Sequence, residues 1–210
     1  MSDLYRYTFL MPMLVYKSFR SFPATTTEFI QFWSGVYESN TEKLYTGNIR
    51  RELNEQRILD LFEWKNGSRL SALKEASVRR NFVERRRELQ QLQPDQNIED
   101  CLSHFAEGGV IHRIFWLHCW CPDRIPIYDQ HVHRAMAFIK SGEPEEIPAN
   151  DASKIASYIE NYLPFFATFD GIELPPLERV VDRALWTFGR FLKQNLSIMD
   201  QKPLQLSRKE

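Results

Sequence analysis

One short segment of this 210-residue chain holds the residues best suited to chemistry. Between positions 125 and 136, a short apolar segment that contains Pro126 leads into a predicted helix. One carboxylate, Asp129, stands at the start of that helix. A carboxylate placed beside a sugar can stabilise the positive charge that builds when a glycosidic bond breaks, and it can activate water. Aspartate is also a favoured helix N-cap, so a capping role is open as well, and one residue can fill both roles.

The histidines and cysteines suggest a second kind of chemistry. All five histidines and all three cysteines lie between positions 101 and 133. Cys101 and His104 have the spacing of zinc ligands, and His131 with His133 could supply two more. The other two cysteines are one residue apart, which is too close for the usual ligand pair, and they end the most apolar segment of the chain. We therefore predict no metal and no cofactor, with a zinc-dependent hydrolase as the outside alternative.

Several familiar catalytic motifs are missing from the sequence. There is no P-loop, no Gly-x-Gly-x-x-Gly after a strand, no Gly-x-Ser-x-Gly elbow and no zinc-deaminase signature. These absences argue against P-loop nucleotide hydrolysis, dinucleotide redox chemistry, α/β-hydrolase chemistry and base deamination. The remaining glycine feature is an adjacent pair, Gly108 and Gly109.

The segment from 126 to 134, placed after Gly108 and Gly109, resembles the helix-hairpin-helix base-excision DNA glycosylases, including the 8-oxoguanine glycosylase type. In that family a Pro-x-Asp-x-His-apolar pattern follows the second helix of a glycine-rich hairpin; here one extra residue separates the proline from Asp129. The resemblance implies an N-glycosylase that binds double-stranded DNA and flips a damaged or modified base out of the stack. It assigns the catalytic role to Asp129.

The likeness covers about residues 105–140 and the final helix, and the chain departs from the family within it. The hairpin keeps only its glycine pair, and Val110, Ile111 and His112 occupy the places around the Schiff-base lysine of bifunctional members. The four-cysteine iron–sulfur loop is missing too. The resemblance therefore implies a monofunctional enzyme. The alternative is a catalytically silent module of the same fold that binds DNA or a protein partner, including one used in genome defence.

The resemblance also implies residues that contact the substrate. The flipped base is expected to meet aromatic and histidine side chains, namely Tyr128, His131, His133, Trp116 and Trp120. The DNA is expected to contact the hairpin and nearby basic residues, namely Gly108, Gly109, His112, Arg113, Arg134, Arg85 and Arg86. A plainer interpretation of the arginine-rich helix is a solvated surface with internal ion pairs such as Glu84 with Arg87. Trp186 is expected to belong to the core.

Composition and periodicity predict a mainly α, multi-helix globular domain, and the resemblance implies that it is of the helix-hairpin-helix glycosylase type. Lys and Arg number 27 against 28 Asp and Glu, a formal net charge of −1, so no overall basic charge attracts nucleic acid. We expect an N-terminal arm over 1–24, the helical domain over 25–198 and a mobile tail over 199–210. The helices are expected at 29–37, 54–62, 68–92, 98–105, 110–120, 130–140, 151–162 and 177–196.

The chain is expected to be cytoplasmic and to have no membrane partner. Its apolar N-terminal stretch is short and interrupted by Pro12, which suits neither a signal peptide nor a membrane span. An odd number of cysteines is a poor framework for disulfides and favours a reducing compartment.

Overall fold

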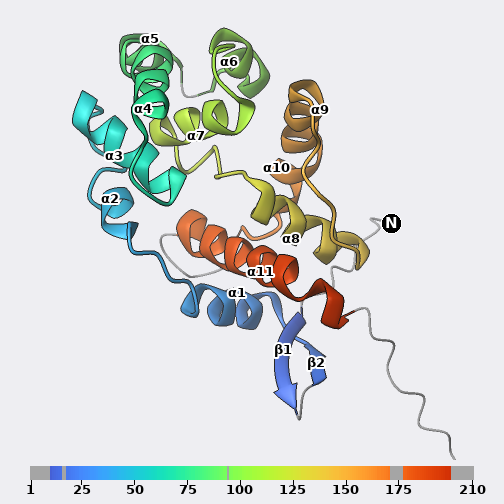
Figure 1. The fold of residues 1–210 in the computed structure, drawn as a ribbon. Helices are drawn as coiled ribbons and strands as arrows, with labels where there is room; N and C mark the ends of the chain where they lie inside the picture. Colours follow the sequence, from blue (N-terminus) through green and yellow to red (C-terminus); the bar gives the residue numbers. More distant parts are fainter. Residues whose placement is uncertain (1–9, 16–17, 94, 171–176, 200–210) are drawn as a thin grey trace, which may run out of the picture.

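The structure is a computed structural model that describes residues 10–15, 18–93, 95–170 and 177–199. Strands β1 (Leu10–Val15) and β2 (Ser18–Pro23) pair as an antiparallel hairpin, and the rest of the described chain is mainly helical, as predicted (Figure 1). Part of the expected N-terminal arm is thus a β-hairpin. Residues 1–9 of that arm and residues 200–210 of the expected tail lie outside the described residues.

The helices follow one another closely along the chain. They are α1 (Thr26–Gly35), α2 (Glu42–Thr46), α3 (Glu55–Asn66), α4 (Ala72–Val78), α5 (Arg86–Gln91), α6 (Ile98–His104), α7 (Val110–Trp120), α8 (Gln130–Ser141), α9 (Asp151–Ala156), α10 (Leu163–Ala167) and α11 (Leu177–Met199). Two π-helical turns, at Arg79–Val83 and Ser157–Tyr162, lie between α4 and α5 and between α9 and α10.

Side chains cap the starts of several helices, and Asp129 takes the capping role that the sequence left open for it. Thr25 and Glu28 form a reciprocal capping box at the start of α1. Asn54 caps α3, and Asp129 caps α8 with its side-chain oxygen. Gly67 ends α3 in the left-handed conformation that glycine adopts without strain. These local signals fix where the helices that surround the cavity begin and end.

Two expected helices differ from the structure. The segment 68–92 is not one continuous helix, because a π-turn at Arg79–Val83 interrupts it and turns three consecutive residues, Asn81, Phe82 and Val83, toward the interior. The helix expected at 151–162 is capped by Asn150 rather than Asp151. It does not stop before Pro164, since this proline falls in the first turn of α10, where helical N–H groups lack intrahelical partners.

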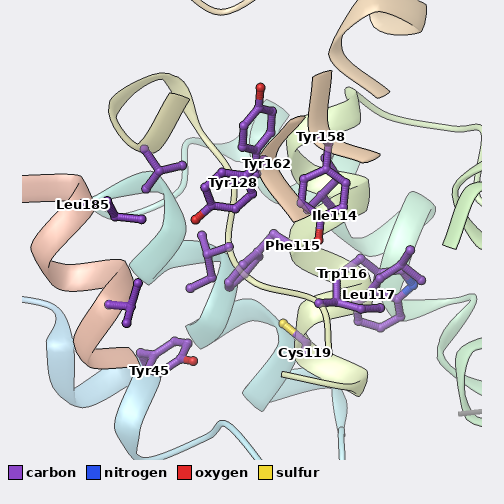
Figure 2. Close-up of a cluster of buried hydrophobic side chains, with 14 of the residues drawn as sticks. Tyr45, Ile114, Phe115, Trp116, Leu117, Cys119, Tyr128, Tyr158, Tyr162 and Leu185 are labelled. Carbon is purple, nitrogen blue, oxygen red and sulfur yellow. The ribbon is translucent and has the colours of Figure 1, made fainter. Parts of the chain in front are cut away.

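Helix α11 lies between α1 and α8 and forms the centre of one half of the molecule (Figure 1). Its Phe188 ring packs edge-on against Phe29 of α1 at 5.2 Å and against Phe138 of α8 at 5.6 Å between ring centroids. The other half is built around α7, whose Trp116 is fully buried (Figure 2). The apolar stripes predicted on α7 and α11 therefore face the core.

A close approach of two backbones fixes α8 against α11. Gly189, within α11, lies so near the first turn of α8 that a Cβ atom there would come within 1.9 Å of the carbonyl oxygen of His131. Glycine weakens a helix interior, but only glycine leaves room for this contact. The contact places the start of α8, with its cap Asp129, directly beside α11.

We predict that Gly189→Ala lowers the free energy of unfolding by about 1–3 kcal/mol or more, because an overpacked contact against backbone cannot relax by a side-chain movement. The matched control is Gly35→Ala in α1, where a Cβ would meet nothing within 4 Å. The control should be neutral or gain up to about 1 kcal/mol from better helix propensity. Urea unfolding of both variants measures this, and equal stabilities would show that the α8–α11 contact is not tight.

Candidate functional site

A cavity of about 940 Å³ lies where several helix ends meet the side of α11. The C-terminal end of α3, the first turn of α7 and the first turn of α8 form its floor and walls, and α11 supplies a long face. Its size suits a small molecule or an extruded nucleotide base. The lining includes ionisable and aromatic side chains that can bind or react with a ligand, namely Lys65, His112, Asp129, His131, Asp182 and Trp186.

Asp129 is the best-positioned carboxylate in the cavity. Its Oδ1 accepts hydrogen bonds from the backbone N–H groups of His131, at 2.8 Å, and Val132, at 3.2 Å. Its Oδ2 accepts a hydrogen bond from Lys65 Nζ at 3.1 Å. The Asp129 side chain thus caps α8 through Oδ1 and forms an ion pair with Lys65 through Oδ2.

Asp129 remains ionised although it is largely buried. Burial alone would raise its pKa, but the charge of Lys65 and the hydrogen bonds from Lys65 and His131 outweigh it and lower the pKa below the usual value. The positive end of the α8 dipole acts in the same direction. The cavity therefore holds a fixed negative charge at neutral pH.

Asp182 of α11 is a second carboxyl group that lines the cavity, and its pKa shifts in the opposite direction from that of Asp129. Its side chain is only 5% exposed, and its Oδ1 is buried without a hydrogen-bond partner. Burial raises its pKa to about 6 despite the neighbouring Arg179. The charge of Arg179, which contacts both Asp182 and Glu42, lowers the pKa of Asp182 but does not outweigh burial. Two carboxyl groups with separated pKa values therefore line one cavity.

Arg179 is held in place by aromatic rings. Its guanidinium lies 4.8 Å from the ring centroids of Tyr45 and Trp64 and 5.0 Å from that of Tyr37. Glu42 accepts hydrogen bonds from Arg179 and from the Trp64 indole N–H. This buried cluster ties α2 and α3 to α11 and makes the cavity wall rigid.

Trp186 offers an aromatic face to the cavity. It is half-buried on α11 and packs edge-on against His131, at 5.2 Å, and Tyr37, at 5.5 Å between ring centroids. The guanidinium of Arg190 lies 5.4 Å from its ring. Trp186 packs against the core as a half-buried residue, in keeping with the expectation, and it also lines the cavity.

The structure brings three of the sequence-predicted site residues together: Asp129, His131 and His112 all line the cavity. His131 and His133 point in different directions, as their spacing on a helix predicts. His112 stands in the first turn of α7, close to the exposed glycine pair Gly108 and Gly109. His112 and Asp129 thus share the cavity, whereas Gly108 and Gly109 are not among its lining residues.

Three expected base-binding residues need correction, because they are buried away from the cavity. Trp116 is 0% exposed within the core (Figure 2). Tyr128 is also 0% exposed, and its hydroxyl is hydrogen-bonded to His133 Nδ1 at 2.8 Å and to Ser157 Oγ at 2.9 Å. His133 is the buried partner in this pair. Trp120 is half-buried on α7 and does not line the cavity.

Most of the arginines expected to hold DNA are engaged within the protein. Arg113 is buried and donates to the Leu102 carbonyl, and Arg134 is buried and pairs with Glu146 at 2.6 Å. Both assignments to DNA are therefore corrected.

Arg85 and Arg86 are half-buried. Arg85 is paired with Glu88 at 2.7 Å, and Arg86 donates to the Val83 carbonyl. The plainer interpretation, a helix with internal ion pairs, fits the Arg85–Glu88 pair.

Sequence reasoning missed Lys65, Asp182 and Arg179. Lys65 is 64 residues from its partner Asp129, and no local pattern joins them. The α11 residues did leave a signal, because polar and aromatic residues recur there at intervals of three and four, at Arg179, Asp182, Trp186 and Arg190. A polar and aromatic stripe beside the apolar stripe of the same helix indicates a second face, which here lines the cavity.

Among the described residues, no group of three or more His, Cys, Asp and Glu side chains is placed to hold a metal ion. Within the same residues, no helix is both long and apolar enough to cross a membrane. No family model, curated protein or solved structure matches this chain.

We predict that the stability of the wild type rises relative to Asp182→Asn as the pH falls from 7.5 to 5. The folded pKa of Asp182, about 6, lies above the unfolded value of 3.8, so the folded state takes up a proton in this window while the unfolded state does not. Asparagine cannot take up that proton. Urea unfolding of both proteins at pH 7.5, 6.5 and 5 measures the difference, and a constant difference would contradict the raised pKa.

Proposed function

We propose that this protein is a DNA N-glycosylase that removes a damaged or modified base from double-stranded DNA. The observation that supports this most directly is an ionised carboxylate, Asp129, set in a cavity that is large enough for an extruded nucleotide and has aromatic residues in its wall. The reaction breaks an N-glycosidic bond through a sugar that carries positive charge, and a carboxylate beside that sugar lowers the barrier. The two backbone N–H groups and Lys65 hold Asp129 in one orientation.

The rest of the cavity suits an extruded base. Trp186 provides a face on which a base can stack. Asp182 provides a buried oxygen without a hydrogen-bond partner, which can accept a hydrogen bond from an N–H group of the base. A base that satisfies this oxygen is favoured over one that leaves it unpaired, so Asp182 would contribute to specificity.

The exposed loop that precedes α7 suits a DNA backbone. Gly108 and Gly109 are exposed, and α7 begins immediately after them without a side-chain cap. The N–H groups of an uncapped helix start bind phosphate oxygens well. Because Ile111 and His112 of the same turn line the cavity, a phosphate on this loop would place its nucleotide beside Asp129. We also propose a cytoplasmic location, which suits the three free cysteines.

We predict that Asp129→Asn lowers the rate of base release by about 10²–10⁴-fold, because asparagine keeps the N-cap but carries no charge and accepts no proton. The measurement is release of free base, by liquid chromatography with mass detection, from duplexes that carry oxidised, alkylated or deaminated bases. Asp123→Asn, which removes an exposed carboxylate outside the cavity, is the matched control.

Undiminished base release by Asp129→Asn would remove Asp129 from the catalytic role. If the wild type releases no base from any duplex yet binds DNA or a stable protein partner, the catalytically silent module is the correct alternative.

We predict that Trp186→Ala lowers base release by roughly 5- to 150-fold on the best substrate of that panel, which corresponds to about 1–3 kcal/mol for loss of stacking on one base. Binding of unmodified duplex should change little, because Trp186 lies within the cavity. Trp120→Ala, a half-buried tryptophan outside the cavity, is the control. Equal losses in the two variants, at a temperature where both are folded, would show that Trp186 does not stack on the base.

A further inference from the structure

The buried cations of the cavity are neutralised by acids of the protein. Lys65 Nζ lies 3.1 Å from an oxygen of Asp129, and Arg179 forms ion pairs with Asp182 and Glu42. The two basic side chains are only 7% and 4% exposed. Because each of these positive charges is already balanced at short range, neither attracts an anionic ligand strongly. An anion that enters the cavity must therefore be bound by other groups of its wall.

A second pair of cations in the cavity wall has no acidic partner. Arg190 and Lys193 of α11 line the cavity, and both are exposed. Within the part of the chain that the structure describes, neither forms an ion pair, and Arg190 contacts the ring of Trp186 instead. Glu38, the other exposed ionisable lining residue, comes from the connection between α1 and α2. Residues three apart on a helix lie on one face, so Arg190 and Lys193 can contact the same anion.

The same face of α11 carries groups that suit a planar ring. Asp182, Trp186 and Arg190 recur at intervals of four residues, and all three line the cavity. At a rise of 1.5 Å per residue, Asp182 and Arg190 are about 12 Å apart along the helix axis. This separation is close to the length of a nucleotide from its phosphate to the far edge of its base. The stripe offers a hydrogen-bond acceptor, an aromatic ring and a cation in the order that a nucleotide requires.

We propose that the cavity binds a free nucleoside 5′-monophosphate, whose phosphate contacts Arg190 and Lys193 and whose base packs beside Trp186. A phosphate monoester carries a charge of about −1.5 to −2 at neutral pH, which two cations on one helix face can balance. Hydrogen bonds between charged partners are strong, and a guanidinium can hold two phosphate oxygens at once. An N–H group of the base would satisfy Asp182 Oδ1, which is buried without a hydrogen-bond partner.

The charges of the cavity support a free nucleotide better than a further contact to the DNA backbone. Arg113 and Arg134, both expected to contact DNA, are buried and bonded within the protein. Arg190 and Lys193 line the cavity itself, so a phosphate that they bind lies beside the ring that packs on Trp186. This inference goes beyond the proposed function and does not require it, because a catalytically silent protein would bind the nucleotide as well.

The experiment is isothermal titration calorimetry of the full-length protein at pH 7.5 with the common ribo- and 2′-deoxyribonucleoside 5′-monophosphates. We expect saturable binding of at least one of them. The corresponding nucleoside, which lacks the phosphate, and the sugar 5-phosphate, which lacks the base, should both bind more weakly. Trp186→Ala should weaken binding of the nucleotide and of the nucleoside alike.

Arg190→Gln and Lys193→Gln should each weaken binding of that nucleotide by roughly 10- to 150-fold, as expected for loss of a hydrogen bond between charged groups. Neither should change binding of the nucleoside. Both side chains are exposed, so the variants should fold. Arg51→Gln and Lys43→Gln are the matched controls, because each removes one positive charge from an exposed residue that does not line the cavity.

Absence of saturable binding of every nucleotide would overturn the proposal, as would equal weakening in the cavity variants and their controls. A sugar 5-phosphate that binds as tightly as the nucleotide would show an anion site without a place for the base, and would also overturn it. If the cavity variants weaken binding of duplex DNA while no free nucleotide binds, the two cations hold the DNA backbone and the proposed function stands without this inference. If nucleotides bind as expected but no duplex releases a base, the nucleotide site stands and the glycosylase does not.

Discussion

The contact between the first turn of α8 and the backbone of α11 at Gly189 is the constraint on which the site depends. A helix interior normally excludes glycine, yet here the missing Cβ lets the carbonyl of His131 approach α11 closely. Asp129 caps the same turn, and Asp182 and Trp186 lie on α11 within two turns of Gly189. A few ångströms of separation at this point would open the cavity and move the carboxylate away from its wall.

The buried ionisable groups in and beside the cavity are stabilised in different ways. Asp129 is kept ionised by Lys65 and a helix start, Arg179 by Glu42 and Asp182 within a cage of aromatic rings, and Asp182 is left with one unpaired oxygen. An unpaired buried oxygen costs free energy in the folded protein. Such a cost is commonly found at functional sites, where a ligand satisfies the group.

The cavity also joins the two halves of the molecule. Lys65 and His112 come from the helices around α7, whereas Asp129, His131 and the α11 residues come from the other half. The buried cluster of Arg179, Glu42 and Trp64 links the halves beside the cavity. The cavity-lining groups therefore stand on helix ends from both halves, and the aromatic residues serve mainly for packing, although Tyr37, Trp64 and Trp186 also line the cavity.

The sequence by itself determined the local structure around the site. The capping aspartate Asp129 and the apolar stripes on α7 and α11 predicted one helix start and two core faces correctly, because these signals act over one or two turns. They also placed one carboxylate at a helix start. Only the tertiary structure decided which side chains share the cavity. Lys65 meets Asp129 across 64 residues, Arg113 and Arg134 are buried and bonded within the protein, and Trp186 lines the cavity while it packs against the core. Periodicity assigns a residue to a face of its own helix, but the neighbour of that face depends on packing between distant segments, which no local pattern records.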